Sequence, residues 1–402
     1  MLKFYSASVR IANTERAVDE CFDIAFANSM PLPEEYKVII VNAPLGHQLD
    51  KVAAAIKKKM PDATVLGSSC SGVSGREGVG ESMSDLAIMA ICGSRQECAV
   101  AEVDGMSGSN SYAKGLELAK ILKAKSPDAT AIYLLCPGIN VTNDFVLKAF
   151  DDIFGKEVVI CGGTSSDNMR GLVNYQYIQD KKTETGAWAI AFSDKTLQFA
   201  TRATHGFTAY GTPMTVTKAE DNKIMEIDGR PAWKEYIARL GLTPGMDSVC
   251  SDTILIGALA EELPEALAKE YGNSHILRTI TKYDDDGTVY YSVSAKKGLK
   301  FWLTNRNENL IFSELRRNLD FIKEQLGTCK PVAVFQTDCL ARGRLLFNKV
   351  MKDEIFAMMH DALSFEGIAP PWIGMYGFGE YARLGTKNMY HNYSTALLIF
   401  YR

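Results

Sequence analysis

The sequence lacks any block of like charge and any long apolar run. It has 44 Lys and Arg residues against 48 Asp and Glu residues, and neither sign gathers in one segment. This balance excludes the basic surface that is typical of proteins that bind nucleic acid or anionic membranes. The longest apolar runs, residues 86–92 and 396–401, are only as long as a strand, so none is expected to span a bilayer. We therefore expect neither nucleic acid nor membrane as a partner.

Paired cysteines and a targeting segment are also missing. The nine cysteines include no CxxC pair, which favours a reduced chain that uses cysteine as a small apolar side chain. The first ten residues, MLKFYSASVR, contain no apolar core of a secretory signal. Both observations predict a cytoplasmic protein.

The common cofactor and metal motifs are absent. The sequence has no GxxxxGK[ST] and no GxSxG, and a GxGxxA match at residues 377–382 is followed by a segment without helical pattern. The histidines show no HxxxH spacing; they are His47, His205, His275, His360 and His391. We therefore expect no cofactor and no bound metal.

What the sequence does contain is a repeated order of elements. Residues 38–44 and 131–137 are apolar runs that end at proline, as expected of buried strands, and a helical pattern follows each. A second run that stops at glycine comes next, and then a further strand. The same order appears a third time in a final copy. The later runs of the three copies are 63–72 and 86–93, 158–167 and 187–194, and 332–336, 372–380 and 395–401.

The approach to the third copy resembles the approach to the second. Residues 97–105 predict a strand before a helix, and residues 299–307 do the same before a helix that carries Leu315, Leu319 and Ile322. These patterns predict an α/β (α+β) fold of two packed domains built from repeated β-α-β-β units with mixed sheets. We expect residues 1–206 to hold two copies and residues 207–402 to hold the third.

Each copy has a strand that ends in glycine followed by small or polar residues, at 67–70, 162–165 and 377–380. Glycine at such a place allows another backbone or a ligand to come close, and freed backbone amides can hold a small anion. A tight turn without any ligand explains the same pattern. The third loop presents Glu380 together with Gly379, which favours a ligand more than the other two do.

The segment TDCLARGR, residues 337–344, places a thiol and arginines where a strand is expected to meet a helix. Cys339 beside these arginines is a candidate stabilised thiolate, and Arg342 is a candidate partner for a carboxylate ligand. The alternative is a buried structural cysteine, with Arg342 paired to Asp338 or Glu380.

His391, Asn392 and Thr395 lead into the last strand and are expected beside the Glu380 loop. Asn392 can donate and accept hydrogen bonds, and Thr395 adds a hydroxyl. A nucleophilic Cys339–His391–Asn392 arrangement is conceivable. Structural hydrogen bonding by these residues is the alternative.

These residues carry a resemblance to a known family. The stretch from Cys339 to Gly343, then Gly374, residues 377–380, His391, Asn392 and Thr395 resembles the FIST C domain, together with residues 277–279 and 297–298. Residues 67–72 and 86–91 resemble the FIST N domain. The resemblance implies an intracellular sensory module for amino acids or related metabolites. It also implies a protein partner that supplies the output.

The leading hypothesis is a small-molecule sensor whose site lies at the third glycine loop. A zwitterionic ligand needs a cation and an anion held apart, and Arg342 and Glu380 supply them. The candidate ligand-binding residues are Arg342, Glu380, Asn392, Thr395, Arg278, Gly379 and Cys339. The rival hypotheses are a cysteine-dependent enzyme with Cys339 as nucleophile, and a protein-interaction module without a ligand.

Overall fold

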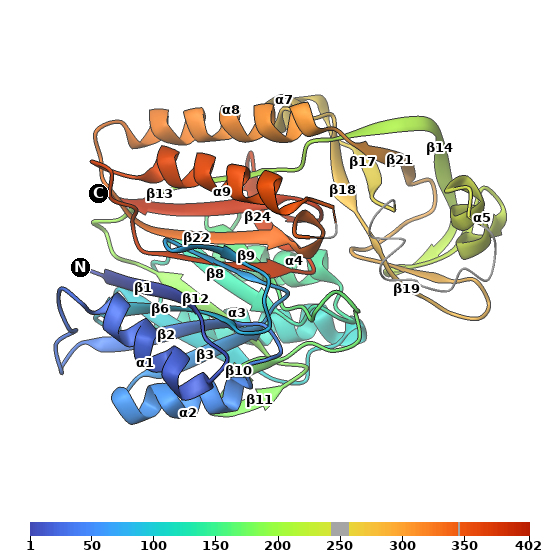
Figure 1. Cartoon of the computed structure of the whole chain (residues 1–402). Coiled ribbons are helices and arrows are strands. Elements are labelled where there is room, and N and C mark those ends of the chain that lie inside the picture. Colours follow the sequence, from blue (N-terminus) through green and yellow to red (C-terminus); the bar gives the residue numbers. More distant parts are fainter. Residues whose placement is uncertain (243–256, 345) are drawn as a thin grey trace.

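The structure, a computed structural model, describes residues 1–242, 257–344 and 346–402. Its described part holds three mixed six-stranded sheets and one antiparallel eight-stranded sheet, with helices over the six-stranded ones. The expected mixed α/β fold is confirmed. Figure 1 shows helices α1 and α2 on one side of the molecule and α8 and α9 on the opposite side. The eight-stranded sheet projects from one end.

The first copy of the repeat begins with a strand and a helix that precede the apolar run at 38–44. Its central strands β2 and β3 are parallel and pair Val38 with Thr64. Both strands are almost wholly buried, which explains their unbroken apolar character. Its elements are β1 (Lys3–Arg10), α1 (Thr14–Ala25), β2 (Tyr36–Ala43), α2 (Leu49–Lys59), β3 (Thr64–Ser69), β4 (Val73–Gly75), β5 (Gly78–Gly80) and β6 (Asp85–Gly93).

The second copy repeats this order element by element. Its parallel pair, β8 and β9, aligns Ala131 with Val159. Its elements are β7 (Cys98–Val103), α3 (Ser111–Lys125), β8 (Ala131–Cys136), α4 (Asn143–Phe154), β9 (Val159–Thr164), β10 (Gln176–Ile178), β11 (Lys181–Thr183) and β12 (Ala187–Phe192). A short 3-10 turn, Gly108–Asn110, precedes α3.

The third copy is interrupted after its first strand. That strand, β13, pairs with β26 at the end of the chain. Its elements are β13 (Gln198–Thr204), α8 (Glu308–Leu326), β22 (Pro331–Cys339), α9 (Lys349–Leu363), β23 (Trp372–Gly377), β24 (Glu380–Leu384), β25 (Lys387–His391) and β26 (Thr395–Tyr401). The strand predicted at 299–307 before a helix is present as β21 (Lys300–Arg306), but it pairs with β14 and β17 and lies outside the sheet of the third copy.

Between β13 and α8 the chain forms the eight-stranded sheet. Its strand order is β18-β17-β21-β14-β15-β20-β19, and β16 pairs with β15. Its elements are β14 (Phe207–Glu220), β15 (Lys223–Ile227), β16 (Arg230–Pro231), α5 (Ala232–Arg239), β17 (Leu259–Glu262), α7 (Glu265–Tyr271), β18 (His275–Arg278), β19 (Ile280–Tyr283), β20 (Val289–Tyr291) and β21 (Lys300–Arg306). We call residues 207–306, as far as they are described, the inserted sheet.

The three six-stranded sheets share one strand order. Each runs from the first strand of a copy to its last strand, then to its parallel pair, and ends on a hairpin from a different copy. Hairpin β4–β5 joins β23, hairpin β10–β11 joins β3, and hairpin β24–β25 joins β9. The copies therefore exchange hairpins in a cycle, and β25 of the third copy lies in the sheet of the second.

Glycine makes this exchange sterically feasible. Gly163 pairs with Glu380, and a Cβ on Gly163 would lie 2.6 Å from the carbonyl oxygen of Gly379. A Cβ on Gly67 would lie 2.9 Å from the Cβ of Tyr177, on the hairpin that joins β3. At Gly163 a backbone atom of the exchanged hairpin comes close, and at Gly67 the side chain of Tyr177 does, so neither position leaves room for a side chain.

One central core lies between the three sheets. Ile40, Tyr133 and Phe335, one from each copy, belong to the same buried apolar cluster. The outer faces of the first and third sheets are covered by α1 with α2 and by α8 with α9. The cluster under α3 and α4 continues into the inserted sheet through residues such as Met214 and Phe301. This continuity fixes the inserted sheet against the second copy.

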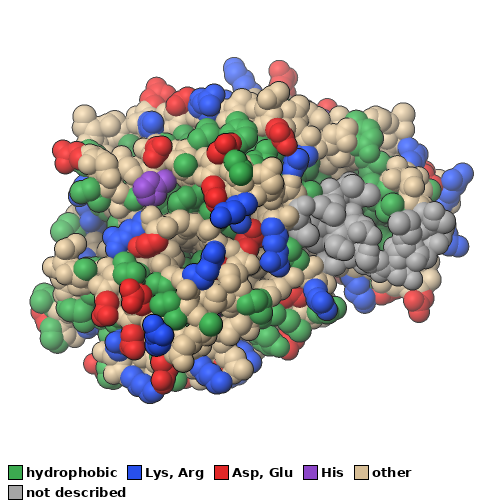
Figure 2. Space-filling model, viewed as in Figure 1, with side chains coloured by type: hydrophobic (Ala, Val, Ile, Leu, Met, Phe, Trp, Pro, Cys, Tyr) green, Lys and Arg blue, Asp and Glu red, His purple; other side chains and the backbone are tan. Residues whose placement is uncertain are grey.

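The surface and the thiols agree with the composition. Figure 2 shows acidic and basic side chains interspersed over the face in view. The eight cysteines that the structure describes form no disulfide, and Cys250 lies outside the described residues. No helix in the described part of the chain is long and apolar enough to cross a membrane.

Candidate functional site

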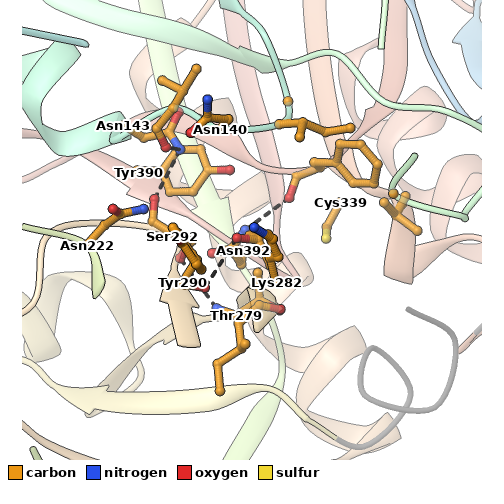
Figure 3. A pocket seen from close by; sticks show the side chains of 18 of the residues that line it. Asn140, Asn143, Asn222, Thr279, Lys282, Tyr290, Ser292, Cys339, Tyr390 and Asn392 are labelled. Carbon is orange, nitrogen blue, oxygen red and sulfur yellow. Dashed lines mark hydrogen bonds between the residues drawn. The ribbon is translucent and has the colours of Figure 1, made fainter. Parts of the chain in front are cut away.

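A cavity of about 380 Å³ lies where the second copy, the third copy and the inserted sheet meet. We call it the amide cavity, because four asparagine side chains line it (Figure 3). Its volume falls within the range of about 300–1,000 Å³ that is usual for small-molecule sites. Its lining residues are 138–141, Asn143, Gly171, Asn222, 279–282, Tyr290, Ser292, 339–341, Phe378, Tyr390, Asn392 and Tyr393.

The hairpin exchange brings these segments together. Strand β8 ends at Cys136 and β22 ends at Cys339, so the segments that follow them lie at the carboxyl ends of parallel strands. Because β24 pairs with β9, hairpin β24–β25 carries Asn392 to the segment after β8. A ligand site between the copies therefore depends on an exchange that joins distant parts of the sequence.

Two non-glycine residues that line the cavity have a left-handed backbone. The φ angle of Asn140 is 57° and that of Tyr393 is 58°. Asparagine tolerates this conformation, but for a bulky tyrosine it is costly and is kept only when the surroundings impose it. The backbone amide of Cys339 donates to the carbonyl of Ser394 at 2.9 Å, which holds the turn around Tyr393 against β22. Such strain is typical of functional sites.

Asn392 presents an unused acceptor at the cavity wall. Its Nδ2 donates to the carbonyl oxygen of Phe378 at 3.0 Å, while its Oδ1 is buried and has no hydrogen-bond partner in the chain. A buried acceptor without a donor costs about 1–3 kcal/mol. A bound donor at this point would remove that cost.

The opposite wall is held by hydrogen bonds within the chain. Asn143 donates to the carbonyl of Ser292 at 3.1 Å (Figure 3). It also accepts from the hydroxyl of Tyr381 at 2.7 Å. Asn222 donates to the carbonyl of Tyr291 at 3.2 Å. The bonds of Asn143 tie the second copy to the inserted sheet and to the third copy, and the bond of Asn222 lies within the inserted sheet, so the wall is a preformed surface.

The cavity carries almost no net charge. Lys282 is the only ionisable acid or base, apart from tyrosine and Cys339, among the described residues that line it. Its ammonium group pairs with Asp284 at 2.9 Å, and Tyr290 donates to the same carboxylate at 2.8 Å. The remaining lining is amide, hydroxyl and apolar surface. This lining suits a ligand without net charge that offers several hydrogen-bonding groups.

Of the predicted site residues, only Cys339 and Asn392 line the amide cavity. Arg342 is 2% exposed; its Nη1 donates to the carbonyl of His205 at 3.3 Å, and its guanidinium lies 5.0 Å from the ring centre of Phe347. Its Nε and Nη2 have no hydrogen-bond partner in the chain. Arg342 is thus a buried cation behind the cavity wall.

Glu380 is fully buried behind the same wall. Its Oε2 accepts from the hydroxyl and the backbone amide of Ser394 at 2.6 and 3.2 Å, while its Oε1 has no partner in the chain. No ion pair within 4.0 Å joins Glu380 to Arg342, although the structure describes both. Burial raises the pKa of the Glu380 carboxyl well above its ordinary value, because desolvation disfavours the charged form.

Three other predicted residues have structural partners. Thr395 donates to Asp338 at 2.6 Å, on the adjacent strand. A Cβ on Gly379 would lie 1.9 Å from the hydroxyl of Tyr390, so only glycine fits there. Arg278 donates to the carbonyl of Tyr390, and its Nε lies 3.4 Å from the Oε2 of Glu261. It lines a separate cleft against α4, which meets the amide cavity at Tyr390.

The environment of Cys339 opposes an activated thiolate. The helix expected after it begins only at Lys349, and a three-residue 3-10 turn follows Cys339 instead. Burial raises the pKa of the Cys339 thiol well above its ordinary value. His391 bonds through Nδ1 to the hydroxyl of Tyr271 at 3.3 Å, and burial lowers its pKa to about 3. No hydrogen bond joins the thiol of Cys339 to the imidazole of His391, although the structure describes both. The predicted Cys339–His391–Asn392 arrangement is therefore not formed.

Sequence reasoning missed most of the cavity wall. The segment Gly138–Asn140 carried a usable signal, because it follows the strand of the second copy at the place where Cys339 and Arg342 follow that of the third. No such signal in the sequence pointed to Asn222, Thr279 or Tyr290, because these residues lie in the inserted sheet, whose strands show no repeat.

Family models identify the chain. A FIST N domain matches residues 37–230 and a FIST C domain matches residues 236–383. The protein belongs to the FIST family. The FIST domains are regarded as sensory and signalling domains, which agrees with the expected resemblance. Within the part of this FIST protein that the structure describes, no group of three or more His, Cys, Asp or Glu side chains is placed to hold a metal ion.

Other comparisons add no functional information about this FIST protein. No curated protein matches the chain. Two solved structures of Thermotoga maritima proteins are similar to it over its whole length and over 72% of their own: PurL complexed with FGAR, at 9% identity, and PurLQS, at 10% identity. Both have a TM-score of 0.21, which is too low to support any statement about fold or function.

Proposed function

We propose that this FIST protein senses a small ligand without net charge, an amino acid or a related metabolite, in the amide cavity. The observation that carries the proposal is the unpartnered Oδ1 of Asn392 in the wall of a cavity of ligand size. An ammonium group is a strong donor to such an amide oxygen. A zwitterion has one, and its overall neutrality suits a lining whose single cation is already paired.

The mode of binding differs from the one that the sequence led us to expect. Arg342 and Glu380 lie behind the wall and do not line the cavity, so the pair does not supply two opposite charges to a zwitterion. Asn392 is the lining group suited to the ammonium end of a ligand, since the one lining cation, Lys282, is paired with Asp284. Apolar contacts with Ile280 and Phe378 add burial for its side chain.

We further propose that the protein works inside the cell and passes its signal to a protein partner. The absence of disulfides among the eight described cysteines supports a reducing compartment. The sensory character of the FIST family supports a partner that reads the bound state.

Isothermal titration of the full chain against the common amino acids and small carboxylates tests the proposal. Asn392→Leu keeps the number and branching of the side-chain heavy atoms and removes the amide, including the Oδ1 acceptor, so affinity should fall about tenfold. Thr279→Trp places a large ring in the cavity and should abolish binding. Thr208→Trp is the matched control, because Thr208 is also half-buried on the inserted sheet but does not line the cavity.

Each result has a defined consequence. Loss of binding in Thr279→Trp with normal binding in Thr208→Trp supports the cavity as the site. If every amino acid and carboxylate fails to bind the wild type, or if Asn392→Leu and Thr279→Trp both bind as the wild type does, the proposal is wrong.

A further inference from the structure

A second hollow, of about 610 Å³, lies between α4, β25 and residues 293–299 of the inserted sheet. We call it the lysine cleft, because Lys148, Lys156, Lys296 and Lys387 line it, with Arg278. It adjoins the amide cavity, because Tyr390 lines both hollows. In addition, Ser292 lines the amide cavity, and Ser294, two residues further along the chain, lines the lysine cleft. Its size is again that of a small-molecule site.

The four carboxylates in the lysine cleft are already bound within the chain. Asp144 accepts from the amide and hydroxyl of Ser294, and Asp151 accepts from Asn388 at 2.9 Å. The other two are satisfied in the same way. Asp152 accepts from Tyr112 at 2.6 Å and from Lys148, and Glu261 accepts from Tyr291 at 2.7 Å and lies 3.4 Å from Arg278.

Three of the basic side chains in the lysine cleft lie outside ion-pair distance of every described carboxylate. Lys156, Lys296 and Lys387 form no ion pair within 4.0 Å with any carboxylate that the structure describes. Arg278 is only 5% exposed, and its Nε, although close to Glu261, makes no hydrogen bond. The lining thus holds five basic side chains against four carboxylates, with three lysines outside ion-pair distance of the described carboxylates and a buried guanidinium N–H that makes no hydrogen bond. A small excess of positive charge in a cleft raises the local concentration of anions.

We infer that the lysine cleft binds a small, multiply charged oxyanion, such as a phosphate-bearing or polycarboxylate metabolite. Lysine ammonium groups act as point charges toward phosphate, and arginine adds directed N–H donors toward phosphate or carboxylate. Three unpaired lysines match a ligand with at least two negative charges. A ligand with no net charge gains nothing from them, so this site differs in ligand class from the amide cavity.

Titration of the full chain at low ionic strength with inorganic pyrophosphate and, separately, with citrate tests the inference. The variant with Lys156, Lys296 and Lys387 all changed to Gln should bind the anion about tenfold more weakly than the wild type. The matched control changes Lys51, Lys120 and Lys323 to Gln, which removes the same charge from exposed lysines elsewhere. It should stay within about twofold of the wild type.

The possible outcomes distinguish phosphate ligands from polycarboxylate ligands. Binding of pyrophosphate alone assigns the cleft to phosphate ligands, binding of citrate alone assigns it to polycarboxylates, and binding of both supports the shared chemistry. The inference is overturned if neither anion binds the wild type, or if the two triple variants lose affinity equally. Amino-acid titration of the cleft variant should match the wild type, so failure here does not depend on the amide cavity.

Discussion

The amide cavity and the lysine cleft share Tyr390 yet differ in charge. The amide cavity has one cation, Lys282, which is paired, whereas the lysine cleft has three lysines without a carboxylate partner. Adjacent hollows of similar size can therefore select opposite classes of ligand, because charge compensation within the chain decides what each one lacks. The amide cavity lacks a hydrogen-bond donor at Asn392, and the lysine cleft has lysines without an ion-pair partner in the described part of the chain.

The largest expected effect comes from filling one hollow while leaving the other open. Thr279→Trp should weaken amino-acid binding on the order of 100-fold, because the ring occupies the ligand volume. Pyrophosphate binding should change less than about twofold, since Thr279 does not line the lysine cleft. Titration of both ligands against the one variant checks this. Loss of both affinities would show that the two hollows act as one site.

The second largest effect is expected from salt, which should weaken binding in the lysine cleft more than binding in the amide cavity. Raising the ionic strength from about 0.1 M to about 1 M shortens the Debye length from about 10 Å to about 3 Å. Binding to the exposed lysines should then fall about tenfold, while binding in the amide cavity, which rests on hydrogen bonds, should stay within about twofold. Calorimetry across a salt series measures both. Equal salt dependence would contradict the difference in charge.

Cys339 reports on the amide cavity alone. Its raised pKa should make alkylation slow at pH 8, and a ligand at about four times its Kd should slow it a further fivefold or so. Peptide mass spectrometry after iodoacetamide treatment gives the rate. Cys329, which is half-buried and lines neither hollow, is the internal control. Protection of Cys339 by pyrophosphate would contradict the distinction between the amide cavity and the lysine cleft.

The smallest effect concerns the buried groups behind the wall. Burial raises the pKa of Glu380 above 4.5 and lowers that of His391 from 6.5 to about 3. Just above pH 4.5 the folded chain keeps a proton on Glu380 that the unfolded chain releases, so this group lowers stability as pH rises. His391 has the opposite effect, because there the unfolded chain binds the proton.

Glu380→Gln should therefore make stability rise more steeply with pH just above pH 4.5 than in the wild type. The difference should be on the order of 1 kcal/mol, and urea unfolding at several pH values measures it. Glu184→Gln, at an exposed position, is the control. An unchanged slope in Glu380→Gln would mean that the folded carboxyl is ionised.

The repeat in the sequence predicted the strands and helices of three copies because buried strands and amphipathic helices have local patterns. At residues 299–307 it predicted a strand before a helix, which is present, but not that this strand belongs to the inserted sheet, because its local pattern is that of the first strand of a copy. The division at residues 206 and 207 stays a prediction. Strand β13, which precedes it, pairs with β26 of the third copy.

The candidate site was predicted in its region but not in its lining. Asn392 and Cys339 reach the amide cavity, whereas Arg342 and Glu380 turn into the interior. Successive residues near a strand end point to opposite faces, and composition does not reveal which face meets the hollow. Arg278 was placed in the right neighbourhood but lines the lysine cleft.

The sequence by itself determined the family, the three copies and the glycines at the strand ends, since each depends on residues close together in the chain. Only the tertiary structure decided which copy receives each hairpin, and thereby which side chains surround the hollows at Tyr390. The physical reason is that backbone pairing between distant strands uses the same hydrogen bonds whichever copy supplies the hairpin. Close packing at positions such as Gly163 and Gly379 then accommodates the observed exchange.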